Sequence, residues 1–175
     1  MKSLWIGSIE IPLRSVLDLD QTYEPIGGES ILRTLSGIGI KQQTWSRLRV
    51  VTSGGGWIPP GLAALDCSTQ QTVACVVPRT IAADVNRQAT LPAARRADAG
   101  CLPYGLALLD DSRVVEVAAS LAGNVATAAA YSGAGVAVGY LLAYYPLLTC
   151  WLLRPTESGS RAEATHRWEL VAEEV

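Results

Sequence analysis

A long stretch without charge constrains this chain more than any other feature. Residues 117–153, the 37 positions between Glu116 and Arg154, contain no Asp, Glu, Lys or Arg. A membrane-spanning helix needs about 20 mainly apolar residues in a row, and residues 134–153 meet that condition. However, glycines and a proline divide the stretch, and no cluster of basic residues flanks it to set a topology. Buried β-strands are therefore the favoured interpretation, with a single membrane-spanning helix as the alternative.

Alternating apolar and polar residues predict strands along most of the chain. The clearest long strand is expected at residues 38–52, after a shorter strand at 30–35 and a tight connection. Three further pairings are predicted from strand-like segments separated by turn residues: 104–109 with 113–119, 124–131 with 136–145, and 147–153 with 165–172. The sequence thus predicts a mainly β fold with long loops and little helix, either an antiparallel β-sandwich or a small β-barrel. We expect a single domain over residues 1–175.

The expected interface residues lie on the long strand and on two predicted loops. Neither face of the strand at 38–52 is cleanly apolar, which favours contact with a partner. The loop at 53–60 combines three glycines with a Pro-Pro pair, and the loop at 79–103 is long for a compact domain. Large aromatic residues and arginines are typical anchors of protein interfaces. We therefore predict a subunit interface that includes Trp45, Trp57, Ile58, Arg95 and Arg96.

Composition excludes several classes of function. Charged residues make up 17% of the chain, below the roughly 25% of ordinary domains, and the net charge of −2 does not favour nucleic acid. The single histidine, His166, has no nucleophile elbow to accompany it, so we expect no catalytic residue and no cofactor. A hydrolase that uses His166 with a serine is the alternative.

The four cysteines do not have the spacing of a zinc site. They are Cys67, Cys75, Cys101 and Cys150, separated by 8, 26 and 49 residues. We expect no bound metal, and interpret them as small buried side chains in a reducing compartment. Two disulfides or an unrecognised metal site remain the alternatives.

Three segments together resemble the small tail structural proteins of long-tailed, siphovirus-like bacteriophages, above all the distal tail protein of the tail tip or baseplate. They are ILRTLSG at 31–37 leading into KQQTWSRL at 41–48, SGGGWIPPGL at 53–62, and YYPLLT at 144–149 running to WELVAEE at 168–174. The resemblance implies a non-enzymatic β-sandwich or barrel protein of the virion tail, made in the host bacterial cytoplasm.

The same resemblance implies the partners. They would be copies of this chain in a ring, sixfold in that family, together with the tail tube protein and the tail hub or baseplate proteins, without nucleic-acid recognition or a membrane span. A tail tube, tail terminator or head–tail completion protein is the alternative within this class.

Overall fold

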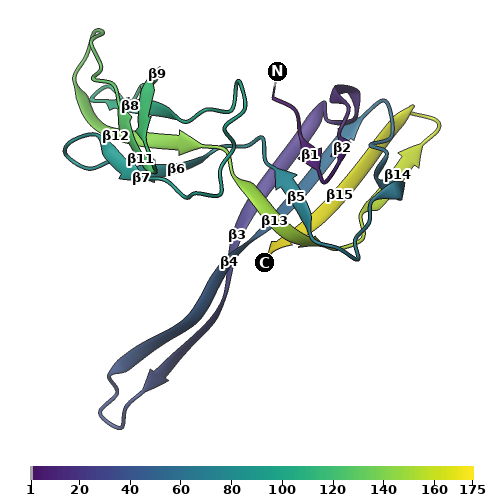
Figure 1. Ribbon diagram of the computed structural model, residues 1–175, viewed down its shortest axis with the longest axis horizontal. Helices are drawn as coiled ribbons and strands as arrows, with labels where there is room; N and C mark the ends of the chain where they lie inside the picture. The colour runs from purple at the N-terminus through teal and green to yellow at the C-terminus, as the bar shows by residue number, and fades with distance from the viewer. Residues whose placement is uncertain (1) are drawn as a thin grey trace. The chain divides into compact units, whose positions relative to one another are not determined.

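The computed structural model describes residues 2–175, and it confirms the mainly β fold with little helix. The described residues form fifteen strands and two short 3-10 helices (Figure 1). The strands lie in three sheets, none of which closes into a barrel within residues 2–175. The sandwich alternative is therefore the better description of the two that the sequence left open.

The chain divides into two compact units, which are described separately. The sheet unit comprises residues 5–73 and 149–175, and the sandwich unit comprises residues 2–4 and 74–148. The chain passes between the units at three points: between Leu4 and Trp5, within β5 (Gln71–Ala74) and within β13 (Leu147–Leu152). Because two of these points lie inside strands and the third directly precedes one, no flexible linker marks the boundary in the sequence.

An eight-stranded sheet forms the sheet unit. Its order is β2-β1-β5-β13-β15-β4-β3, with β14 paired to β15. The remaining elements of this unit are β1 (Trp5–Ile6), β2 (Ile9–Glu10), η1 (Leu13–Ser15), β3 (Asp18–Arg33), β4 (Gly39–Gly56), η2 (Leu62–Ala64), β14 (Thr156–Ser160) and β15 (Thr165–Glu174). β13 pairs with β15, as the sequence predicts, although the connection between them contains the additional strand β14.

The core of the sheet unit lies on one face of β4 and β15. Val50, Leu170 and Ala172 are buried at alternate positions, so each strand presents a regular apolar face to the core. The registers Leu170↔Thr52 and Ala172↔Val50 place these side chains beside one another. Alternation of this kind, rather than the overall hydropathy, fixes which face of each strand turns inward.

The glycine triplet of residues 54–56 belongs to a strand and not to the predicted loop. All three glycines lie in β4 and pair with β15, in the register Trp168↔Gly54 to His166↔Gly56. The prediction failed because glycine disfavours strands in general but is used where another group approaches the sheet closely.

Close approach to Trp168 explains the first of these glycines. A Cβ added at Gly54 would lie 2.7 Å from Nε1 of Trp168. The buried indole donates a hydrogen bond to the carbonyl oxygen of Ser15 at 2.9 Å. At Gly56, a Cβ would lie 1.9 Å from the carbonyl oxygen of Arg14. The missing side chains thus let the η1 segment and an indole ring pack directly on the sheet.

Two sheets packed face to face form the sandwich unit. One contains β10 (Ala119–Ala122), β11 (Val125–Ala128) and β7 (Gln88–Thr90), in that order. The other contains β6 (Arg79–Ala82), β12 (Ala137–Tyr144), β8 (Tyr104–Leu109) and β9 (Val114–Val117). The β8–β9 hairpin is confirmed. The segment 79–103, predicted as a loop, contains β6 and β7.

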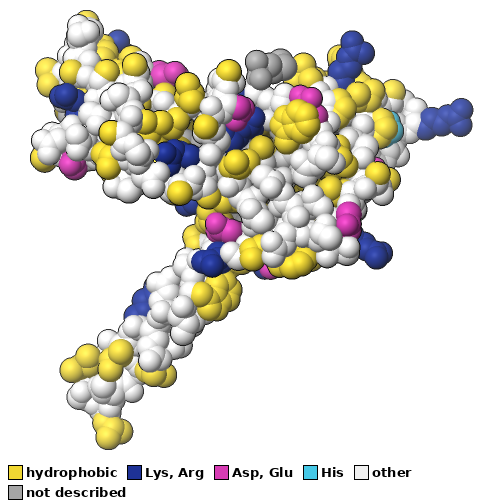
Figure 2. Space-filling view, viewed as in Figure 1, with side chains coloured by type: hydrophobic (Ala, Val, Ile, Leu, Met, Phe, Trp, Pro, Cys, Tyr) yellow, Lys and Arg dark blue, Asp and Glu magenta, His cyan; other side chains and the backbone are white. Residues whose placement is uncertain are grey.

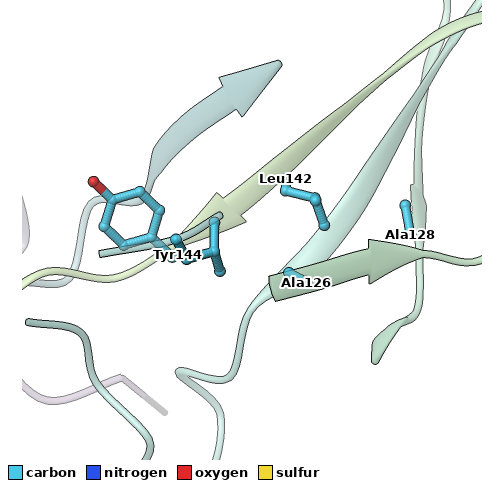
Figure 3. Packing of buried hydrophobic residues seen from close by; sticks show 5 residues of the cluster. Ala126, Ala128, Leu142 and Tyr144 are labelled. Carbon is cyan, nitrogen blue, oxygen red and sulfur yellow. The ribbon is translucent and has the colours of Figure 1, made fainter. Parts of the chain in front are cut away.

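Small side chains allow the two sheets to approach closely. Ala126 and Ala128 of β11 pack against Leu142 and Tyr144 of β12 in one buried cluster (Figure 3). At Gly105 of β8, a Cβ would lie 2.8 Å from the Cβ of Ala128. The small side chains of these alanines therefore keep a thin sandwich tightly packed.

The uncharged stretch packs against itself across this sandwich. The sequence predicts that residues 124–131 and 136–145 pair as a hairpin, but β11 pairs with β10 and β7, while β12 pairs with β6 and β8. The two strands lie in opposite sheets, so their contact is through side chains instead of the backbone. Residues 134–153 contain β12 and β13, and within residues 2–175 no helix is long and apolar enough to cross a membrane.

We expect Gly54→Ala to destabilise the sheet unit and Gly55→Ala to be tolerated. The first change forces Trp168 away from β4 and is expected to cost about 1–3 kcal/mol, as is typical of overpacked cores. At Gly55 the nearest atom to an added Cβ is 3.7 Å away, an ordinary contact. Urea denaturation followed by Trp fluorescence measures both, and equal unfolding midpoints for the two variants would contradict this account.

Candidate functional site

The hairpin of β3 and β4 continues well beyond the sheet to which it belongs. β15 pairs with β4 only as far as Glu173↔Arg49, whereas β3 and β4 pair with each other from there to Arg33↔Gly39. We call residues 25–48 the arm. At about 3.3 Å per residue its length is about 30 Å. Figure 1 shows the arm as a ribbon that projects from the sheet.

The end of the chain secures the base of the arm. The carboxylate of Glu174 accepts a hydrogen bond from the backbone N–H of Leu48 at 2.9 Å, just past the last β4–β15 pair. Arg49 donates two hydrogen bonds to Oε1 of Glu173, at 2.7 and 2.9 Å, and Arg47 donates to the carbonyl oxygen of Val175. The arm therefore leaves the sheet at a defined position.

A β-bulge lies in the middle of the arm. The register passes from Gly28↔Trp45 to Glu29↔Gln43, which leaves Thr44 as the extra residue. The hydroxyl of Thr44 donates to the carbonyl oxygen of Gly28 at 3.1 Å. A Cβ at Gly28 would meet both Thr44 and the indole of Trp45 within 3 Å. Here Gly28 lets Trp45 lie across the ribbon, and a bulge increases the twist of the strands that carry it.

Apolar side chains gather at the tip of the arm without any core to cover them. Ile31, Leu32, Leu35, Ile38 and Ile40 are each exposed over half or more of their surface. Figure 2 shows these hydrophobic side chains at the end of the projecting ribbon. A two-stranded ribbon buries little by itself, and a patch of this kind marks an interaction surface.

The turn at the tip presents two of these side chains outward. The backbone N–H of Gly37 bonds to the carbonyl oxygen of Thr34 at 2.9 Å, and that of Thr34 bonds to Ile38 at 3.0 Å. Gly37 has φ +85°, in the left-handed region where glycine is favoured. Leu35 is fully exposed at the apex. The turn is thus held by its own backbone, and its apolar side chains are left for a partner.

Charge is distributed unevenly between the arm and the rest of the chain. The arm contains three basic residues and one acidic residue, a formal charge of +2. The remainder of the sheet unit contains five basic and ten acidic residues, a charge of −5, and the sandwich unit, with six basic and five acidic residues, has a charge of +1. Together these make the −2 of the whole chain.

Two grooves lie on the surface of the sheet unit. The acidic groove, of about 510 Å³, runs over the outer face of β3, β4, β14 and β15, and its lining includes Asp18, Asp20 and Glu169. The apolar groove, of about 810 Å³, lies between the η2 segment and the β13–β14 connection. Its apolar lining comprises Leu62, Ala63, Leu65, Cys67, Leu152, Leu153 and Pro155.

The aromatic residues expected at an interface are exposed, but they are not brought together. Trp45 lies in the arm and Trp57 directly follows the other end of β4, and both have half or more of their surface exposed. Twelve residues of extended chain separate them, about 40 Å. Ile58 is partly buried beside Trp57. These residues therefore belong to two separate surfaces of the sheet unit.

The two arginines expected at the interface bind their own chain. Arg96 is buried and donates to the carbonyl oxygens of Ser3 and Cys75, at 2.8 and 3.1 Å, as well as to Asp98. Arg95 donates to the turn between β10 and β11. An irregular segment leaves carbonyl groups without strand partners, and the guanidinium groups satisfy them. Arg96 is therefore not available as an interface anchor.

The arrangement around His166 does not form a catalytic triad. The imidazole is partly exposed on β15 and, among the described residues, has no hydrogen-bonded serine or carboxylate. Cys75, Cys101 and Cys150 are fully buried, whereas Cys67 is partly exposed. No three His, Cys, Asp or Glu side chains within residues 2–175 come together as metal ligands. The arm and the grooves remain the features from which a function can be argued.

Comparison with models of protein families, with curated proteins and with solved structures finds no match to this chain. The assignment of function therefore depends on the geometry and chemistry of the chain itself.

The apolar arm tip was not among the predicted sites, although the sequence carries a signal for it. Residues 30–35 and 38–52 are predicted as strands joined tightly, and that hairpin is present. The apolar residues on both sides of its turn have no other apolar strand of matching length to cover them. Considering both strands together, with Leu35 in the turn, would identify an exposed apolar tip.

We expect the ion pair of Arg96 and Asp98 to make stability depend on pH in acid. Hydrogen bonding to Arg96 lowers the pKa of Asp98 to about 2. A carboxylate whose pKa is lowered by folding stabilises the protein above its unfolded pKa of about 3.9, and this contribution is lost as the pH falls toward 2. Asp98→Asn should therefore reduce the urea midpoint above pH 4, and its difference from the wild type should shrink between pH 4 and pH 2. A difference that is constant over this range would contradict the assignment.

Proposed function

We propose that this chain is a non-enzymatic structural subunit that assembles with copies of itself through the arm. The observation that carries the proposal is the apolar tip, held about 30 Å from the sheet by a ribbon whose base is secured to β15. Holding such residues in water is costly unless a partner covers them. An arm that reaches beyond its own fold is suited to joining neighbouring subunits.

Within this class we propose a component of a bacteriophage tail tip or baseplate. The subunits would form a ring that joins the tail tube to the hub, with tail tube and hub proteins as further partners in the virion. The support is the sequence resemblance in the three segments, one of which includes the arm tip and Trp45, together with the mainly β fold. Tail tube, tail terminator and head–tail completion proteins are the alternatives.

The experiment for this proposal is the oligomeric state of the purified chain. We expect sedimentation to show reversible self-association, and negative-stain electron microscopy at high concentration to show closed rings. A chain that remains monomeric at all concentrations, with and without candidate tail proteins, would overturn the proposal. Rings viewed in this way also give the number of subunits, for which the family resemblance leads us to expect six.

We expect the double substitution Leu35→Ser and Ile38→Ser to abolish this association without unfolding the chain. Neither side chain packs against a core, so the urea midpoint should not change. If each contributes about 1.5 kcal/mol of burial to the contact, the dissociation constant should rise about a hundredfold. Val85→Ser, at a site exposed over 98% of its surface outside the arm, is the matched control. Unchanged sedimentation of the double variant would contradict a role for the tip.

We also expect Trp57→Ala to impair assembly while the subunit still folds. Its side chain is exposed over 66% of its surface, and its backbone N–H bond to Arg14 is kept in the variant. Trp57 lies on a surface distant from the tip, so its loss tests a second contact. Circular dichroism monitors folding and sedimentation monitors assembly. Full assembly of this variant would exclude Trp57 from the interface.

A further inference from the structure

We propose that the arm tip of one copy docks in the apolar groove on the sheet unit of a second copy. This inference rests on the proposed function and names the partner surface. The groove is the one between the η2 segment and the β13–β14 connection, lined by the buried Leu62 and Leu152 and by the partly exposed Leu65 and Pro155. The contact joins two different surfaces of identical chains.

The tip and the apolar groove both expose aliphatic side chains. The tip offers Leu35 and Ile38 from its turn, followed by the cross-strand pair of Leu32 and Ile40. The groove exposes Leu153 over 56% of its surface. The acidic groove is a poorer match for the tip, because its lining is mainly carboxylate, hydroxyl and glycine. Burial of apolar side chains thus favours the apolar groove.

The charges beside the two surfaces are opposite in sign. Arg33 and Lys41 flank the apolar residues of the tip, and Lys41 is paired with Glu29 of the arm at 2.7 Å. Asp66 and Glu157 lie at the apolar groove, together with one basic residue, Arg154, and Glu157 also lines the acidic groove. Hydrogen bonds from Ser68 and Thr69 lower the pKa of Asp66 and so favour its ionised form. The same complementarity holds more widely, since the arm carries +2 and the rest of the sheet unit −5. Such fields direct encounters and set the register of an interface.

The arm of a chain does not dock in the apolar groove of the same chain. The arm continues the strands β3 and β4 outward from the sheet, and the contacts of Leu48 and Arg49 with β15 hold it in that direction. A second copy is therefore the occupant that charge complementarity and direction favour. A head-to-tail contact of this type repeats from one copy to the next, and it closes into a ring when the rotation permits.

A native thiol in the groove makes this contact directly testable. Cys67 lines the groove and is partly exposed, whereas the other three cysteines are fully buried. In the variant Leu35→Cys, a thiol at the tip should meet Cys67 of the next copy. Mild oxidation with diamide should then produce a ladder of disulfide-linked oligomers on a non-reducing gel.

Two controls separate this contact from random collision. The variant carrying both Leu35→Cys and Cys67→Ser should produce no ladder, since only tip-to-tip dimers remain possible. Val85→Cys places an equally exposed thiol outside the arm and should form no ladder through Cys67. A ladder that persists without Cys67, or no ladder for Leu35→Cys alone, would overturn the proposed docking.

Charge exchange gives an independent measurement. Arg33→Glu and Glu157→Lys should each weaken self-association, and their combination should restore it, because the pair regains opposite charges. If the association free energy lost by the double variant equals the sum of the losses of the two single variants, these residues do not contact each other.

The outcomes also distinguish this inference from the proposed function. If Leu35→Ser and Ile38→Ser abolish self-association but no link to Cys67 forms, the arm assembles copies through another surface and only the docking site is wrong. If the arm tip of the purified chain binds a different protein, and the chain never associates with copies of itself, both proposals fail.

Discussion

The pairing of β15 with β4 ends at Arg49, whereas the pairing of β3 with β4 extends to Gly39. The projecting arm and its exposed apolar tip both follow from this difference in length. Inside the sheet, each residue of β4 from Arg49 to Gly55 has a partner in β15 on one side and a partner in β3 on the other. Beyond Arg49 only β3 remains, so the ribbon has two exposed faces and no layer to cover either of them. Apolar residues are then covered only by contact with another molecule.

β4 thus contributes to folding at one end and, in the proposed assembly, to association at the other. At its C-terminal end, the glycines of β4 allow Trp168 and the η1 backbone to come into close contact with the sheet. This contact packs the η1 segment against β4 and β15. At its N-terminal end, the same strand carries Lys41, Trp45 and the exposed Ile40. Because the two parts are separated along the strand, changes at the tip leave the core unaffected, and assembly can be tested separately from stability.

The sequence predicts the class of fold and several of its parts. The mainly β content, the β8–β9 hairpin and the pairing of β13 with β15 are confirmed, since each depends on local alternation and turn residues. The pairing of residues 124–131 with 136–145 was wrong, because strands adjacent in sequence can lie in opposite sheets of a sandwich. Arg96, predicted at a subunit interface, is buried within its own chain, where hydrogen-bond partners from residues 3, 74, 75 and 98 surround it.

By itself the sequence determined that the chain is mainly β, where several of its strands lie, and that the long uncharged stretch is broken into short pieces. These properties depend on neighbouring residues and on a period of two along each strand. Only the tertiary structure decided where β15 stops relative to β4, and hence that the tip of the hairpin has no core. That outcome depends on the lengths of strands about 120 residues apart in the chain, a relation between distant segments that no local pattern contains.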